Sequence, residues 1–271
     1  MDVLHWVLFG VLPALAVMVL GVGVGGSRWL ALALAVALCV PFAMATGHPD
    51  WPWRLDWRYG APLPWLWWSL LAAGVLGSLG DARWLPRALA QALEVALVIA
   101  LPWLLTGTLR RSWSFEQHVL WLCAAWLATF VVWALLREVG RSRPGLLVPL
   151  VGMLALGVDA WLLRAHGVQL QWELAGVGAC ALLFAMSTML WRWPLVCGTG
   201  AALCITVAHV GLLWCGRPLR EVRELPFVLA LVVPVPLVLV TMRRFAKSPR
   251  LAFAIGLLAC GGVAAAAVLV R

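Results

Sequence analysis

Long apolar stretches, each close to the length of a membrane-crossing helix, recur along this chain from one end to the other. Such a helix needs about 20 predominantly apolar residues to cross the hydrocarbon core of a bilayer. Ten ranges meet this requirement: 4–25, 28–46, 64–80, 86–106, 118–136, 146–164, 173–191, 194–214, 226–242 and 250–270. We therefore predict an all-α transmembrane helical bundle. It forms a single integral membrane domain over residues 1–271, with short loops and no soluble domain.

The composition excludes the soluble alternatives. Hydrophobic residues make up 64% of the chain and charged residues only 11%, whereas ordinary soluble domains have about 45–50% and about 25%. A soluble fold of this size would need far more charge on its exterior. These values exclude a soluble enzyme, a disordered chain and a disulfide-stapled secreted module.

The N-terminus and the basic residues indicate where the protein resides. The first residues carry Asp2 and lack the basic start of a signal peptide, so we expect the first span to be retained. The abundance of Arg, Ala, Gly and Trp is typical of a GC-rich genome, and we expect a bacterial cytoplasmic (inner) membrane location. The arginines lie in loops on both sides, with a small excess that favours both termini outside. The net charge of +9 therefore does not indicate a nucleic-acid partner.

Two segments about half the chain apart resemble each other. Residues 96–102 and 230–236 share an apolar run ending in proline, and a Thr-x-Arg-Arg sequence follows each of them. This predicts a weak five-plus-five internal repeat, which many transporters contain. Matches of this kind also arise easily in a chain rich in Ala, Leu and Val. The two Arg-Arg ends would moreover face opposite sides of the membrane.

Ionisable side chains inside predicted spans are candidates for function because placing them in hydrocarbon is costly. Glu94 lies near the middle of its span, with Gln91 three residues earlier on the same face. His209 lies in the second half of the eighth span, and a Glu94–His209 pair would form a proton relay. Either residue could instead be a polar contact between packed helices. Asp159 lies toward the end of the sixth span, where pairing with an arginine is the simpler expectation.

Two prolines interrupt the ninth span. Pro234 and Pro236 remove two amide donors within one turn, which predicts a kink or a local unwinding. Broken helices often form the midplane binding site of a transporter. The alternative is a structural kink whose freed carbonyls are satisfied by neighbouring hydroxyls or water.

The longest polar connection, from Gly47 to Pro64, combines aromatic, acidic and basic residues. Tryptophans favour the bilayer interface, so the simplest interpretation is a loop lying flat on the membrane. A second interpretation is a site for a sugar or lipid headgroup, with acid–base candidates among its side chains. The candidate residues are His48, Asp50, Trp51, Trp53, Asp56 and Trp57.

Familiar catalytic and metal-binding motifs are missing from the sequence. The seven cysteines form no C-x-x-C pair, and most lie within predicted helices, where Cys acts as a small apolar residue. We expect neither a metal site nor a disulfide framework nor a cofactor. There is no Walker A, G-x-S-x-G or H-E-x-x-H sequence, and we assign no catalytic residue.

Three functions are consistent with these features. A small-solute carrier or permease is supported by the many spans, the broken helix and the buried Glu94 and His209. A non-catalytic membrane subunit or scaffold of a larger complex is supported by the absence of a dense polar cluster and by many Trp and Gly residues suited to helix packing. A membrane enzyme acting on lipid or lipid-linked sugar would use the loop at 47–64. The carrier and the subunit have equal support from the sequence, and the carrier is taken as the working hypothesis. The expected partner is the lipid bilayer, joined by other membrane subunits in the second case.

Overall fold

The computed structural model describes residues 11–25, 29–46, 62–81, 84–107, 113–142, 146–190, 199–216, 224–241 and 248–270. These segments are helical and contain no strand, which confirms the predicted all-α class. The helices are α2 (Leu12–Gly25), α3 (Leu30–Thr46), α4 (Pro62–Asp81), α5 (Arg87–Thr106), α6 (Phe115–Ser142), α7 (Leu147–Ala165), α8 (Gln169–Leu190), α9 (Thr199–Gly216), α10 (Glu224–Leu231), the 3-10 turn η6 (Val235–Leu237), α11 (Val238–Thr241) and α12 (Pro249–Leu269).

Seven of the described helices are long and apolar enough to cross a membrane, namely α4 to α9 and α12. This supports a helical membrane protein. Each of the ten predicted ranges contains a helix. However, α2 and α3 are shorter than a full span, and the ninth range is broken, so the prediction of ten crossings is not confirmed.

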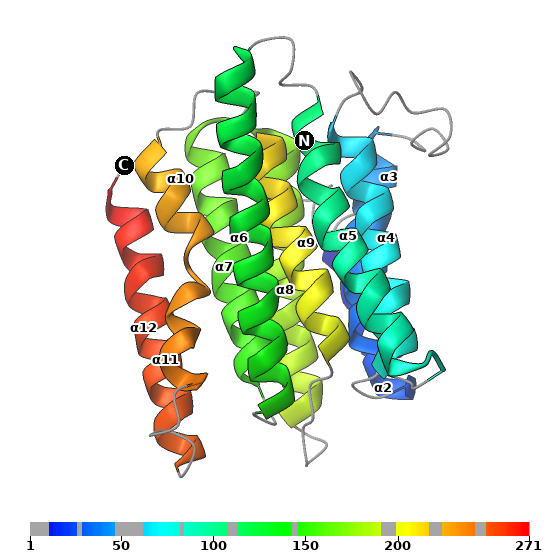
Figure 1. Cartoon of the computed structure of the whole chain (residues 1–271). Coiled ribbons are helices and arrows are strands. Elements are labelled where there is room, and N and C mark those ends of the chain that lie inside the picture. The colour runs from blue at the N-terminus through cyan, green and yellow to red at the C-terminus, as the bar shows by residue number, and fades with distance from the viewer. Residues whose placement is uncertain are drawn as a thin grey trace.

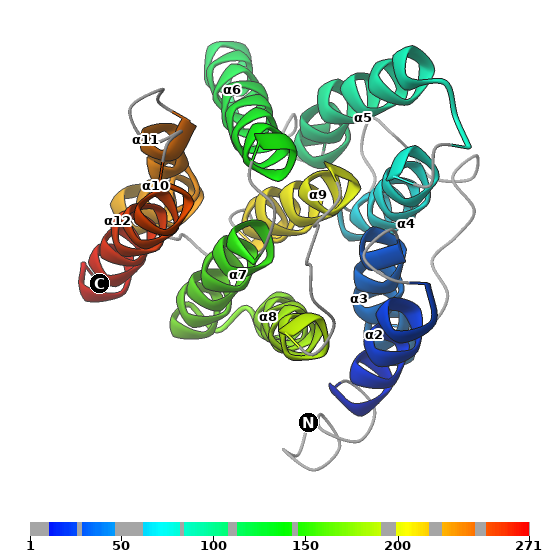
Figure 2. The same ribbon diagram turned by 90° about the horizontal axis from the view of Figure 1, so that it is seen from below.

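Helix α9 lies at the centre of the bundle, surrounded by α4, α5, α6, α7 and α8 (Figure 2). All of its residues from Gly200 to Gly216 are buried. Its sequence is rich in Ala, Gly, Cys and Thr, and small residues of this kind let neighbouring helices approach closely. Because α9 is enclosed on all sides, His209 near its middle lies in the interior of the protein.

Helix α9 is joined to α4 at its first turn. The two backbones lie in close contact at Gly77 and Gly200. One turn later, Asp81 at the end of α4 accepts hydrogen bonds from the Gly200 amide at 3.1 Å and the Thr199 hydroxyl at 3.3 Å. A carboxylate satisfies the free amide hydrogens at a helix N-terminus, so α4 positions the start of α9.

The predicted break in the ninth range is confirmed. After α10 ends at Leu231, a turn and the η6 segment lead to the short α11. The amide of Val235 bonds to the Val232 carbonyl at 2.9 Å, and that of Leu237 bonds to the Pro234 carbonyl at 3.1 Å. These bonds reach back three residues and not four. The Leu231 carbonyl therefore loses its usual helical donor, which would have been the Val235 amide.

The helices that follow α9 lie at one edge of the bundle. Figure 1 shows α12 alongside α10 and α11, and η6 also contacts α12. The segment 230–236 is broken, whereas the similar segment 96–102 lies inside the continuous α5 despite Pro102. The five-plus-five repeat is not confirmed.

Candidate functional site

Two ionisable side chains meet inside the bundle, between α7 and α9. Nδ1 of His209 lies 2.7 Å from Oδ2 of Asp159, and both side chains are 0% exposed. Asp159 was expected to pair with an arginine, and this expectation is wrong. The nearest arginine in sequence, Arg164, follows five residues later and so projects from a different face of α7. Its guanidinium lies 5.5 Å from the centre of the Trp172 ring.

The second nitrogen of His209 reaches the broken helix. Nε2 lies 3.4 Å from the carbonyl oxygen of Leu231, slightly beyond the usual N–H···O range of about 2.7–3.2 Å, so the hydrogen bond is a weak one. This is the same carbonyl that the break deprives of its helical donor. One imidazole ring thus connects the carboxylate on α7 to the last residue of α10.

These two contacts determine how many dissociable hydrogens the Asp159–His209 pair carries. A carbonyl oxygen only accepts, so Nε2 of His209 carries a hydrogen when it bonds to Leu231. The 2.7 Å contact with Asp159 needs a second hydrogen, carried either by Nδ1 or by the carboxyl group. The pair is neutral overall in both arrangements, which is compatible with its complete burial. Oδ1 of Asp159 has no hydrogen-bond partner within the described segments.

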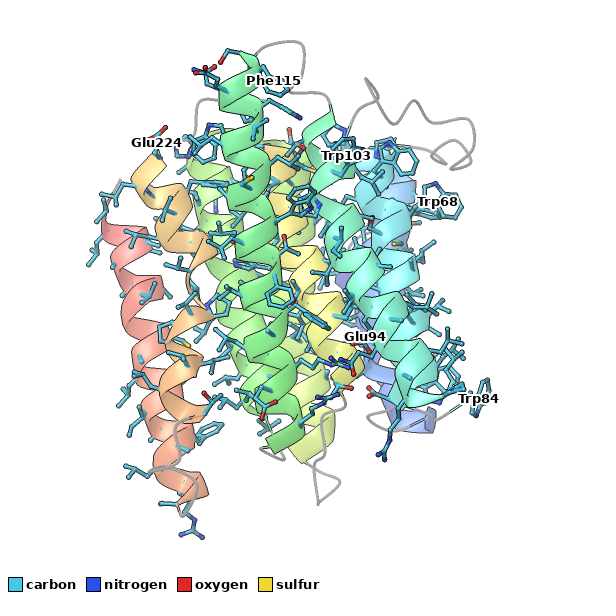
Figure 3. The ribbon with its side chains drawn as sticks, viewed as in Figure 1. Trp68, Trp84, Glu94, Trp103, Phe115 and Glu224 are labelled. Atoms are coloured by element: carbon cyan, nitrogen blue, oxygen red, sulfur yellow. The ribbon has the colours of Figure 1, made fainter. Side chains whose placement is uncertain are left out.

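A second buried pair joins α5 to α6. Oε2 of Glu94 lies 3.3 Å from Nε of Arg137, and the side chains are 4% and 10% exposed. The guanidinium also lies 4.9 Å from the centre of the Trp133 ring. Figure 3 places Glu94 nearer the end of the bundle marked by Trp84 than the end marked by Trp103 and Phe115.

The structure therefore corrects the predicted Glu94–His209 pair. Glu94 forms an ion pair with Arg137 of α6. His209, on the face of α9 turned toward α7, forms a hydrogen bond with Asp159. Gln91 is exposed although Glu94 is buried, so the two do not share a buried face. Two separate pairs replace the single relay.

The structure describes the positions of some of the remaining candidate residues and not of others. Pro234 is buried and Pro236 is partly buried, and both lie in the break beside Leu231. The six loop candidates, His48, Asp50, Trp51, Trp53, Asp56 and Trp57, lie outside the described residues. Within the described segments, no group of three or more His, Cys, Asp or Glu side chains could hold a metal ion.

Sequence reasoning missed two charged residues with structural partners. Arg137 falls just beyond the predicted span 118–136, but α6 continues to Ser142 and carries Arg137 into the interior. Asp81 directly follows the predicted range 64–80, yet it caps the first turn of α9. One signal was available for Arg137, since it lies one helical turn after Trp133, where an arginine can stack on the ring.

The comparisons with known proteins do not identify this chain. No protein family model matches it, and no curated protein or solved structure matches it. The function is therefore argued from the arrangement of the two buried pairs and the broken helix.

Proposed function

We propose that this protein is a proton-coupled carrier of a small solute in a bacterial cytoplasmic membrane, with Asp159 and His209 as its proton-binding site. One observation carries the proposal. A completely buried carboxylate–imidazole pair contacts, through Nε2 of His209, the carbonyl at which α10 breaks. This arrangement combines a group that can gain and lose a proton with a segment that can change conformation.

The position of the pair supports proton binding. Asp159 lies on α7 and His209 on α9, and both helices are long and apolar enough to span a membrane. Ionisable groups at such positions are rare and commonly form proton pathways in pumps and transporters. Imidazole is the side chain whose ordinary titration lies nearest to neutral pH. A proton bound here would be sequestered from water on both sides of the membrane.

The broken helix supports transport. Non-helical backbone at membrane depth is tolerated where protein or a cavity surrounds it, and transporters use such segments to bind and release their solutes. Phe227 of α10 packs against Trp214 of α9 with ring centres 5.4 Å apart. The half of the span before the break is thereby fixed to the core, so Pro234 and Pro236 lie where the second half could move relative to it.

In this proposal the Glu94–Arg137 pair does not carry the proton. It holds α5 and α6 together near one end of the bundle, where Asp81 also holds α4 to α9. Gln91, being exposed, has no part in either pair.

The experiment compares purified wild type with Asp159→Asn. The first measurement is the number of protons released when the pH is raised from about 5.5 to about 8.5, the range around the titration of imidazole. We expect the variant to release fewer protons than the wild type. Glu173→Gln is the matched control, since Glu173 is a buried carboxylate on α8 that accepts a bond from Gln169 at 3.1 Å. Equal release by wild type and Asp159→Asn would refute the proton site.

The second measurement is uptake into proteoliposomes driven by a pH gradient. The probes are labelled monosaccharides, amino acids, amines and carboxylates. We expect uptake of at least one class to depend on the gradient and to be lost in Asp159→Asn but kept in Glu173→Gln. Gradient-driven uptake that persists in Asp159→Asn would contradict the proposal.

A non-catalytic membrane subunit is the second candidate, and the packing of α9 favours it. The helix is buried along its length from Gly200 to Gly216 and touches α4 backbone to backbone. Such packing suits a rigid scaffold, in which Asp159 and His209 would be a fixed polar contact. That role predicts no proton release from the pair below the pH at which the protein unfolds.

A further inference from the structure

We infer that the hydrogen bond from Nε2 of His209 to the Leu231 carbonyl is a proton-dependent latch on the break between α10 and α11. The term latch refers here to that hydrogen bond alone. The inference rests on the proposed proton site and adds how binding of the proton would be transmitted to the moving segment.

The latch exists because the break leaves one carbonyl without a helical donor. In a continuous helix, the Leu231 carbonyl would accept the Val235 amide hydrogen. That hydrogen goes to Val232 instead, at 2.9 Å. Nε2 of His209, at 3.4 Å, is the donor that lies within reach. A buried carbonyl without a donor is unfavourable, so this one contact stabilises the observed form of the break.

The protonated pair keeps the latch closed. Nε2 donates to Leu231, and the second hydrogen lies between Nδ1 of His209 and Oδ2 of Asp159. Both nitrogens then face acceptors with a hydrogen in between. Each contact is attractive, and the pair is neutral.

Loss of one proton to water opens the latch. The imidazole then keeps a single N–H, for which an ionised carboxylate and a neutral carbonyl compete. A hydrogen bond to a charged acceptor is roughly twice as strong as one between neutral groups. The hydrogen therefore resides on Nδ1, beside Asp159. The lone pair of Nε2 then faces the carbonyl oxygen of Leu231, and an attractive contact becomes a repulsive one.

The surrounding contacts determine which segment responds. Phe227 holds α10 against Trp214, so the helix before the break stays with α9. Beyond the break, η6 and α11 pack against α6 and α12. The segment released by the latch is therefore 232–241, and the expected change is a movement of this segment relative to α10.

The charges around the latch come from the pair itself. The ionisable group in contact with Asp159 is His209, at 2.7 Å between Nδ1 and Oδ2. The helices packed against α7 and α9 carry other titratable or charged groups, most of which are thiols, paired groups or groups near helix ends. Together with His166 in the turn after α7, those of the described segments are Cys39, Asp81, Arg87, Glu94, Glu116, His118, Cys123, Arg137, Glu138, Arg141, Arg164, Glu173, Cys180, Cys204, Cys215, Glu224, Arg250 and Cys260.

Three substitutions separate the two contacts of the ring. His209→Gln can place an amide N–H where Nε2 lies, so it keeps the bond to Leu231. His209→Asn is shorter by one methylene, reaches only the Nδ1 position and leaves the Leu231 carbonyl without a donor. Asp159→Asn removes the charged acceptor, so the imidazole hydrogen stays on Nε2 and the latch stays closed at every pH.

The experiment is amide hydrogen exchange of the full chain in lipid nanodiscs at about pH 5.5 and about pH 8.5, chosen to bracket imidazole titration. Rates are divided by the chemical exchange rate at each pH. A peptide from α8 is the internal reference. For the wild type, we expect residues 232–241 to be about threefold to tenfold better protected at the lower pH, as the loss of one hydrogen bond implies. We expect His209→Gln and Asp159→Asn to be protected at both pH values, and His209→Asn at neither.

Two results would overturn the latch. One is equal corrected protection of wild-type 232–241 at both pH values, and the other is equal protection in His209→Asn and His209→Gln. Loss of protection in α8 would show that a His209 variant is misfolded. The test then depends on Asp159→Asn, for which the latch requires that the protection of 232–241 no longer changes with pH. A failed latch with intact proton release would leave Asp159–His209 as a proton site that does not move the break. Unchanged proton release in Asp159→Asn would instead remove the proposed function.

Discussion

Gly77 of α4 and Gly200 of α9 contact each other through their backbones, with no side chain between them. A methyl group added at Gly77 would lie 2.7 Å from the carbonyl oxygen of Gly200 and 2.8 Å from its Cα. Neither helix can move away independently, because Asp81 bonds to the first turn of α9 one turn later. The contact and the cap together fix the depth at which α9 places His209.

Gly77→Ala should destabilise the bundle. The added methyl would meet backbone atoms, which cannot change rotamer, and overpacking of this kind typically costs about 1–3 kcal/mol. We expect a lower thermal midpoint in detergent, measured by loss of the monodisperse peak on size-exclusion chromatography. Gly157→Ala is the matched control, since nothing lies within 4 Å of an added methyl there. Equal midpoints for the two variants would show that the helices separate without penalty.

Asp81→Ala should weaken the N-terminus of α9. The carboxylate accepts hydrogens from the Gly200 amide and the Thr199 hydroxyl, and loss of an N-terminal cap typically costs about 0.5–2 kcal/mol. Asp81→Asn keeps an oxygen acceptor and should retain part of this stability. The measurement is the thermal midpoint, with amide exchange of the first turn of α9 as a local readout. Increased exchange throughout the bundle, and not in this turn, would argue against a capping role.

Removing one partner of the Glu94–Arg137 pair should be more damaging than removing both charges. A single substitution, Glu94→Gln or Arg137→Gln, leaves one buried charge uncompensated, which typically costs about 3–5 kcal/mol. We expect the double variant to recover a large part of that loss. Thermal midpoints of the four proteins form the cycle, and Gln91→Ala, one turn away and exposed, is the control. Additive losses would mean that the two side chains do not interact.

Much of the fold followed from local properties of the sequence. Apolar length predicted where helices lie, and the missing amide hydrogens of Pro234 and Pro236 predicted the break between α10 and α11. Both depend on the residues of a single segment. The pairing of ionisable groups depends on how helices turn toward one another. For this reason Glu94 and His209 were correctly identified as buried but wrongly paired.

The contacts that the sequence did not predict have the same physical explanation. Asp159 and His209 are 50 residues apart in the sequence, and their contact depends on the rotation of α7 and α9 about their own axes. Arg137 was assigned to a loop because apolar composition ends before the helix does. A membrane-crossing helix that continues past its apolar stretch can bring an arginine inward to an acidic partner, as α6 does toward Glu94.

Restoring the amide hydrogens in the break should stabilise the protein and impair its transport. In Pro234→Ala/Pro236→Ala, the segment can continue as an α-helix, and the Leu231 carbonyl can again accept the Val235 amide hydrogen. Because alanine lets the segment form the helical hydrogen bonds that proline prevents, we expect a higher thermal midpoint and slower amide exchange over 232–241. Because the carbonyl would no longer need His209, the pH dependence of that exchange should disappear. We also expect gradient-driven uptake to be lower in this variant than in the wild type.

Pro102→Ala is the matched control for this variant. Pro102 lies inside α5, which is continuous around it, and the hydroxyl of Thr106 already donates to its carbonyl at 2.8 Å. We expect this control to keep both uptake and the pH-dependent exchange of 232–241. Suppose that Pro234→Ala/Pro236→Ala shows the same uptake as the wild type and slow amide exchange over 232–241. A continuous ninth span would then be sufficient for transport. The role assigned to the break would then be wrong, whereas the proton site at Asp159 and His209 would still be open to its own test by proton release.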